Sequence, residues 1–189
     1  MDASLTLGTW VGFSNSQPAT ASLPGLREQP VVLRQRLRVP WVVGAARLGY
    51  RLGSRISLEL GYAIAPVRVS VENEGVPLFP GSATGAVHTL AFRPRVRIAR
   101  IGVATIGYAF AGPAMVWRTG KAFAGNEGTL RGAANVGVGV TFNAGKVRFR
   151  VDLEDVIYTS ALQRPDGVQA ECAVQHDVQL SLGIILLRP

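Results

Sequence analysis

The sequence predicts an all-β fold, an eight-stranded antiparallel up-and-down β-barrel. Apolar residues alternate with small or polar ones in about eight segments, and this period of two places successive side chains on opposite faces of a strand. Short and long connections between the segments also alternate strictly. The chain has 189 residues, of which 22 are Gly and 17% are charged, a composition more typical of a barrel wall than of a soluble enzyme. The length predicts one domain, residues 1–189.

The last strand shows the alternation most clearly. One of its faces carries Val178, Leu180, Leu182, Ile184 and Leu186, and the other carries Asp177, Gln179, Ser181 and Gly183. The same division predicts strands over residues 55–66, 87–98, 132–142 and 147–158. Weaker alternation predicts three more strands over residues 4–13, 41–52 and 102–112, which completes the count of eight.

The connections indicate how the two ends of the barrel differ. Tight turns are predicted at Gly53-Ser54, near Ala99-Arg100 and at Asn143-Ala144-Gly145. The long connections cover residues 14–40, 67–86, 113–131 and 159–175, and residues 31–39 within the first are themselves extended in character. All long loops therefore lie at one end, and the turns with both termini lie at the other. Transmembrane barrels arrange their outer loops and periplasmic turns in this way.

The size of the side chains decides which face points inward. An eight-stranded barrel has little room inside, so the bulky apolar face is predicted to point outward. The charged residues of the inward face carry both signs on facing strands, which predicts a salt-bridged plug rather than a wide channel. The predicted lumen charge network is Arg47, Arg51, Glu59, Arg93, Arg95, Arg97, Arg148, Arg150, Asp152, Glu154 and Asp177.

The outward face is predicted to form an apolar band edged by aromatic girdles. The girdle residues are Tyr50, Phe142 and Phe149 near the turns, and Phe13, Tyr62 and Phe110 nearer the loops. Asp155 departs from this pattern, because unbroken alternation from Glu154 to Ile157 would turn it toward lipid. A β-bulge or the membrane boundary would relieve that conflict.

Several other functions are disfavoured by the composition. No run approaches the roughly 18 consecutive apolar residues that a membrane helix needs. The net charge of +8 comes almost wholly from Arg, but the arginines alternate singly along strands, so no nucleic acid partner is expected. Cys172 is the only cysteine, and His88 and His176 are the only histidines. We therefore expect no disulfide, no metal site and no cofactor.

No enzyme activity is expected either. His88 could approach Ser82 or Thr84, and His176 is next to Asp177, but isolated histidines at strand starts are more often rim residues than catalytic ones. No Gly-Xaa-Ser-Xaa-Gly motif occurs. The carboxylates of the predicted outer loops have no calcium-loop spacing; they are Glu127, Asp166 and Glu171.

Residues 50–62 (YRLGSRISLELGY), 147–158 (VRFRVDLEDVIY) and 176–187 (HDVQLSLGIILL) resemble the small outer-membrane β-barrel family, the barrels similar to outer-membrane protein A. The resemblance implies a bacterial outer-membrane protein in contact with lipid, with other envelope proteins as partners of its outer loops. Met1-Asp2-Ala3 lacks the features of a signal peptide, so a mature chain is expected. The ending Leu187-Arg188-Pro189 departs from the family's aromatic or large apolar last residue.

The function predicted from these features is structural or surface-interacting, with a scaffold barrel and recognition by the outer loops. If the barrel conducts, Arg93, Arg95, Arg97, Arg148 and Arg150 would favour anions. One alternative is a soluble lipocalin-like carrier of a small apolar ligand, because Gly8-Thr9-Trp10 matches part of the lipocalin fingerprint. Another is a barrel subunit of a larger envelope assembly, whose apolar outer face would contact protein.

Overall fold

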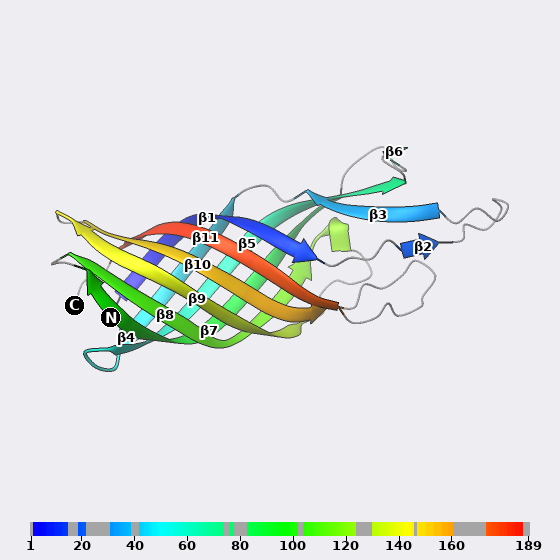
Figure 1. Cartoon of the computed structure of the whole chain (residues 1–189). Helices are drawn as coiled ribbons and strands as arrows, with labels where there is room; N and C mark the ends of the chain where they lie inside the picture. The colour runs from blue at the N-terminus through cyan, green and yellow to red at the C-terminus, as the bar shows by residue number, and fades with distance from the viewer. Residues whose placement is uncertain are drawn as a thin grey trace.

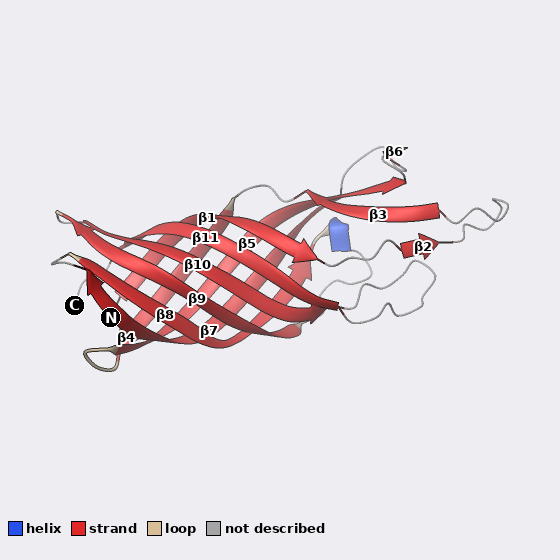
Figure 2. Cartoon of the chain, in the orientation of Figure 1, coloured by secondary structure: helices blue, strands red, loops and turns tan. Residues whose placement is uncertain are grey.

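The computed structural model describes residues 2–14, 19–21, 31–38, 42–73, 76–77, 83–101, 104–123, 130–145, 147–160 and 173–186. Eight strands within these ranges form a closed antiparallel barrel (Figures 1 and 2). They are β1 (Asp2–Ser14), β4 (Val43–Arg51), β5 (Ile56–Asn73), β7 (Ala83–Ile101), β8 (Thr105–Thr119), β9 (Arg131–Ala144), β10 (Val147–Ser160) and β11 (Ala173–Ile185). The predicted fold class is confirmed.

The barrel has up-and-down topology, because each strand pairs with its neighbours in the order β5-β4-β1-β11-β10-β9-β8-β7 and β7 pairs back with β5. Closure leaves no unpaired edge along this ring of strands. We call the end at which β4 meets β5 and β9 meets β10 the turn end, and the opposite end the loop end. Both termini lie at the turn end (Figure 1).

Several strands are longer than predicted and extend past the barrel at the loop end. β5 continues to Asn73, β7 begins at Ala83 and β8 continues to Thr119, so the predicted loops 67–86 and 113–131 are too long. The predicted loop 14–40 contains β2 (Ala19–Ala21) and β3 (Val31–Arg38), so the extended character predicted for residues 31–39 is confirmed over 31–38, and residue 39 lies outside the described residues. β3 pairs with the end of β5, as does β6 (Val76–Pro77). Backbone pairing with β5 joins β3 and β6 to the barrel.

The short connection predicted near Ala99-Arg100 lies a few residues later, between Ile101 and Thr105. β7 continues through these residues to Ile101, and the register of β7 with β8 shifts between Arg97 and Ala99. A residue inserted by such a bulge bends a strand without ending it. The turn at residues 52–55 is as predicted, and in the β9–β10 turn Gly145 adopts a φ of 62°, which favours glycine.

Two layers of side chains fill the barrel. Charged and polar groups occupy its middle, and an apolar cluster occupies the loop end. The cluster includes Phe123 of the short 3-10 helix η1 (Lys121–Phe123), which follows Gly120 with a φ of 93°. Gly85 leaves the space for the Phe123 ring, because a Cβ there would lie 2.9 Å from it. In the described part of the chain, no helix has the length and apolarity to cross a membrane.

Candidate functional site

Seven of the predicted lumen residues form one continuous ionic network in the middle of the barrel. Arg47 of β4 contacts two carboxylates of β10, through Nη1 to Asp152 Oδ2 at 2.8 Å and through Nη2 to Glu154 Oε1 at 2.6 Å. Asp152 also accepts from Arg150 Nε at 2.8 Å. Because alternate residues of a strand share one face, β10 alone supplies three buried charges to the lumen, Arg150, Asp152 and Glu154.

Glu59 of β5 joins the opposite side of the barrel to this network. It lies directly across from Arg93 in the β5–β7 register, and Arg93 Nη2 is 2.7 Å from Glu59 Oε1. Arg150 Nη1 is 2.7 Å from Glu59 Oε2, and Arg95 Nη1 is 3.6 Å from the same oxygen. Arg93 also pairs with Glu154. Four guanidiniums therefore share three carboxylates.

Neutral side chains complete the hydrogen bonding of the buried charges. Arg47 Nη1 donates to Thr6 at 3.1 Å and to Ser181 at 3.3 Å, while Arg150 Nη1 donates to Ser4 at 3.2 Å. Asn135 accepts from Arg93 at 3.0 Å, and the Tyr108 hydroxyl donates to Asp152. Charges withdrawn from water are tolerated only with this degree of pairing, since each loses its hydration.

Phe110 was predicted to belong to the outer aromatic girdle, and this is wrong. Its side chain is buried in the lumen, with the Arg93 guanidinium 4.3 Å above the ring centroid. Tyr108 also points inward, and the Arg95 guanidinium lies 4.8 Å from its ring centroid. In the register of β8 with β9, Phe110 faces Gly137 and Tyr108 faces Gly139. The two glycines leave room inside the barrel for aromatic rings, which the prediction had placed outside because of their size.

Gly137 is expected to tolerate no side chain, because an added Cβ would overlap the Phe110 ring and the Leu153 carbonyl oxygen. Gly137→Ala should lower the free energy of unfolding by about 1–3 kcal/mol, the usual cost of overpacking. Urea unfolding of the refolded protein, followed by tryptophan fluorescence, measures this. Gly132→Ala is the control, since its Cβ would meet no atom within 4 Å. Equal stabilities for the two variants would contradict the tight packing of Phe110.

The remaining predicted lumen residues lie outside the seven-residue network. Asp177 is buried nearer the loop end, where it accepts from the Tyr158 hydroxyl at 2.8 Å. Arg51 and Arg97 are exposed at the turn end, and Arg148 is half-buried there, with its Nε 2.9 Å from Asn143 Oδ1. The predicted lumen charges thus divide into a central network, a single carboxylate nearer the loop end, and a basic mouth at the turn end.

The outer wall of the barrel is apolar. Outward side chains that are at least 45% exposed include Leu5, Leu7, Leu60, Phe92, Val138, Leu153, Leu180 and Leu182. Among the predicted girdle residues, Tyr50 and Tyr62 are exposed, and Phe142 and Phe149 stack on each other with centroids 5.4 Å apart. Phe13 lies in β1, but its side chain is outside the described residues. The girdle role of these aromatic residues stays a prediction.

An outward aromatic cluster at the loop end was missed in the sequence. His88 stacks on Trp117 with an interplanar angle of 5°, and its ring nitrogens lie 2.7 Å from the Tyr62 hydroxyl and 2.9 Å from the Thr119 hydroxyl. Of the hydroxyls proposed to lie near His88, Ser82 is outside the described residues. The signal that could have revealed the cluster is that His88 shares the phase of Leu90 and Phe92.

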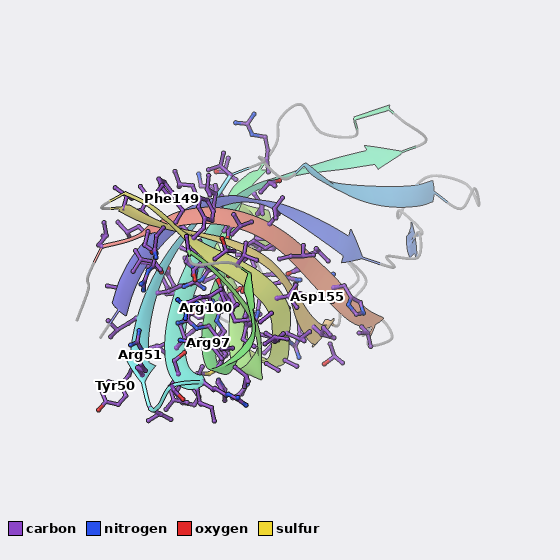
Figure 3. The ribbon with its side chains drawn as sticks, turned by 60° about the vertical axis from the view of Figure 1, so that its left-hand side comes forward. Tyr50, Arg51, Arg97, Arg100, Phe149 and Asp155 are labelled. Carbon is purple, nitrogen blue, oxygen red and sulfur yellow. The ribbon has the colours of Figure 1, made fainter. Side chains whose placement is uncertain are left out.

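Asp155 faces outward, as unbroken alternation requires, and no bulge removes it. Its strand keeps a regular register with both neighbours. Its carboxylate Oδ2 instead lies 2.7 Å from Nδ1 of His176 on the adjacent strand. Figure 3 shows Asp155 well away from Arg51, Arg97 and Arg100. Of the two alternatives, the bulge is therefore excluded and the membrane boundary stays a prediction; a hydrogen-bonded partner accompanies the charge.

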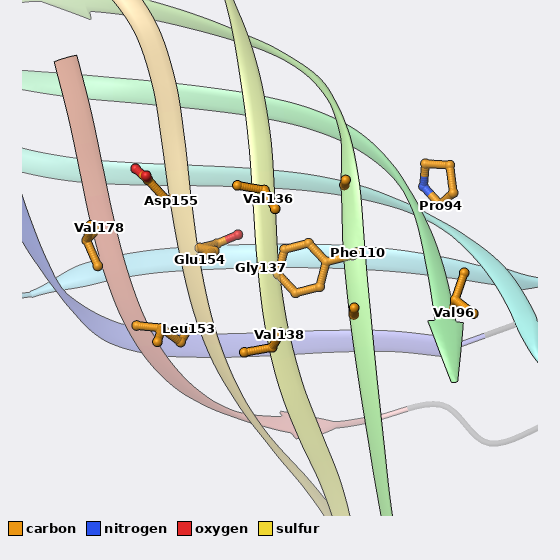
Figure 4. Close-up of a pocket in the computed structure, with 12 residues that line it drawn as sticks. Pro94, Val96, Phe110, Val136, Gly137, Val138, Leu153, Glu154, Asp155 and Val178 are labelled. Atoms are coloured by element: carbon orange, nitrogen blue, oxygen red, sulfur yellow. The ribbon is translucent and has the colours of Figure 1, made fainter. Parts of the chain in front are cut away.

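A shallow apolar groove of about 690 Å³ runs over the outside of the barrel wall (Figure 4). Its lining comes from β7, β8, β9, β10 and β11 and includes Pro94, Val96, Val136, Val138, Leu153 and Val178. The inner cavities are much smaller. Two that border the ionic network and the apolar cluster measure about 20 and 10 Å³, which is room for about one water molecule each.

The described residues hold no group of three or more His, Cys, Asp or Glu side chains placed to bind a metal ion. Cys172 lies outside the described residues. The carboxylates that do gather, Glu59, Asp152 and Glu154, are each paired with guanidiniums. The site is thus a buried ionic core in which every carboxylate is paired with a guanidinium.

Comparison with solved structures finds similarity over almost the whole chain. The outer membrane protein AlkL, solved by solid-state NMR in DMPC lipid bilayers, has a TM-score of 0.59 and 11% identity, covering 99% of this chain and 90% of that one. The outer membrane protein OprG from Pseudomonas aeruginosa has a TM-score of 0.53 and 10% identity, covering 99% and 97%. The fold is that of a small outer-membrane β-barrel. No family model and no curated protein matches the chain.

The resemblance noted in the sequence is confirmed at the level of this outer-membrane barrel fold. At 10–11% identity, the similarity lies in the backbone and not in shared side chains. The ionic core, the basic mouth and the outward aromatic cluster must therefore be interpreted from this chain's own residues.

Proposed function

We propose that the chain is a bacterial outer-membrane barrel with a structural or surface-interaction role, and that its lumen is plugged. The main support for the proposal is the distribution of polar and apolar side chains, which is the reverse of that in a soluble protein. Guanidiniums and carboxylates fill the interior, while Leu, Val and Phe side chains cover the outside. Such an outer face is stable only against lipid or another apolar surface. The similarity to outer-membrane barrels supports lipid as that surface.

The plug has two successive layers. Ion pairs between β4, β5, β7 and β10 cross the middle of the lumen. The apolar cluster around Phe123 then fills the loop end. Conduction would require opening both layers, so we assign the barrel a scaffold role. Recognition then belongs to the outer connections, where β3 and the end of β5 extend the sheet beyond the barrel (Figure 1); residues 161–172 lie outside the described range.

The packing favours this function over a lipocalin-like carrier. A carrier needs an apolar cavity inside and a polar surface outside, whereas here buried Arg93, Arg150 and Asp152 occupy the interior. The other alternative, a barrel subunit of a larger envelope assembly, would have the same ionic core inside the barrel. It differs in that protein would cover the outer apolar band.

The first test is how the whole chain behaves with and without detergent. We expect no soluble fraction in plain buffer, and we expect the detergent-solubilised protein to migrate differently on a gel before and after boiling, because a closed hydrogen-bonded barrel resists dodecyl sulfate until it is heated. A monodisperse protein in plain buffer would refute the membrane location.

The same refolded sample tests the plug. Reconstituted into planar bilayers at moderate voltage, it should give no stepwise current. A steady open channel of either ion preference would refute the plug while leaving the membrane location intact.

A further inference from the structure

The turn end of the barrel opens into a small basic mouth. Its cavity measures about 60 Å³, and among the described side chains its lining has no Asp or Glu but five arginines, Arg51, Arg55, Arg95, Arg97 and Arg148. Ser54, Ser57 and Thr141 add hydroxyls to the same wall. The mouth adjoins the ionic core and shares only Arg95 with it among the described charged residues, and every carboxylate of that core already has a guanidinium partner.

The backbone brings the mouth arginines together from three strands, β4, β7 and β10, and from the β4–β5 turn. The N–H of Arg97 donates to the carbonyl of Arg55 at 2.8 Å, which ties the β4–β5 turn to β7. Ser57 lies opposite Arg51 in β4 and opposite Arg95 in β7. Arg148 enters from β10 on the other side. Figure 3 shows Arg51 and Arg97 at the same end of the barrel.

The positive charge of the mouth is not neutralised within the described chain. The guanidiniums of Arg51, Arg55 and Arg97 make no hydrogen bond or ion pair with another described residue, and the Arg148 guanidinium donates to the neutral Asn143. Arg95 has a carboxylate within 4 Å, but Glu59 is shared with Arg93 and Arg150. Like charges held this close repel, so an anion that enters the mouth gains from several of them at once.

We propose that this basic mouth binds a phosphate-bearing anion. A guanidinium presents a planar pair of N–H donors that matches two oxygens of a phosphate, and a phosphate has enough oxygens to bridge several guanidiniums. The serine and threonine hydroxyls of the wall are further donors to those oxygens. A free phosphate compound and a phospholipid headgroup share this chemistry. The free-phosphate arm does not depend on the membrane location proposed above.

The test is calorimetric titration of the full refolded chain in neutral detergent with inorganic phosphate at low ionic strength. Arg51→Gln combined with Arg97→Gln should weaken binding at least about tenfold, since two charge-assisted contacts are lost. Both residues are exposed, so folding should be unaffected. The control combines Arg68→Gln with Arg131→Gln, which removes the same charge at two loop-end positions and should weaken binding less than twofold.

A second arm repeats the titration in micelles that contain phosphatidylglycerol. If the lipid competes with phosphate in the unsubstituted protein but not in the mouth variant, a lipid headgroup is the occupant. If phosphate binds equally with and without the lipid, the occupant is a free phosphate compound. The proposal is overturned if neither phosphate nor lipid distinguishes the mouth variant from the loop-end control.

Discussion

Replacing Glu59 by Gln is expected to lower the free energy of unfolding by about 3–5 kcal/mol, because it breaks a buried ion-pair network from one side. Glu59 partly neutralises the positive charges of Arg93, Arg95 and Arg150. No other carboxylate of the described lumen contacts Arg95. The amide keeps the shape of the side chain. The loss therefore measures uncompensated charge and not a cavity.

Urea unfolding of the protein refolded into lipid vesicles, followed by tryptophan fluorescence, measures the difference in the free energy of unfolding between the variant and the unsubstituted protein. Asp155→Asn is the matched control, since this carboxylate faces outward and pairs with the exposed His176; its effect should stay within about 1 kcal/mol. If the two variants lose the same small amount, the ionic core contributes little to stability. The core would then have to be explained by closure of the lumen alone.

Leu180→Arg is expected to destabilise the protein in lipid by about 2–4 kcal/mol, the cost of a guanidinium near the bilayer midplane on the lipid face of a barrel. Leu180 is 49% exposed near the middle of β11, on the outer apolar wall. In water the same substitution on an exposed strand residue would cost far less. The experiment therefore asks what covers the outer face.

Leu186→Arg provides the control at another depth. Leu186 is 59% exposed immediately beyond the turn-end terminus of β11, where the membrane interface is expected and the cost should fall to about 0–1 kcal/mol. Unfolding in vesicles compares the two variants directly. Equal costs at both positions would contradict a bilayer around the barrel, and would favour a protein partner that covers the whole outer wall.

The amino-acid sequence by itself determined the strand count, the up-and-down order and the direction of most side chains. These follow from local rules: a period of two assigns alternate residues to opposite faces, and bulky groups do not fit inside eight strands. Leu182 outward with Ser181 inward, and Asp152 inward with Leu153 outward, needed no knowledge of neighbouring strands. Strand ends were less predictable, since β5 and β7 stay paired as far as Val69 and Ala83, beyond the predicted ends at residues 66 and 87.

Only the tertiary structure decided what each inward residue meets. Phe110 points inward because Gly137, which lies across from it on β9, has no side chain and because the Arg93 guanidinium covers the ring. Arg93 and Arg97 have the same phase on one strand, yet Arg93 is held by Glu59 and Glu154 while Arg97 is exposed at the mouth. Contacts of this kind join residues far apart in the chain and depend on register and on height along the barrel, which no local pattern encodes.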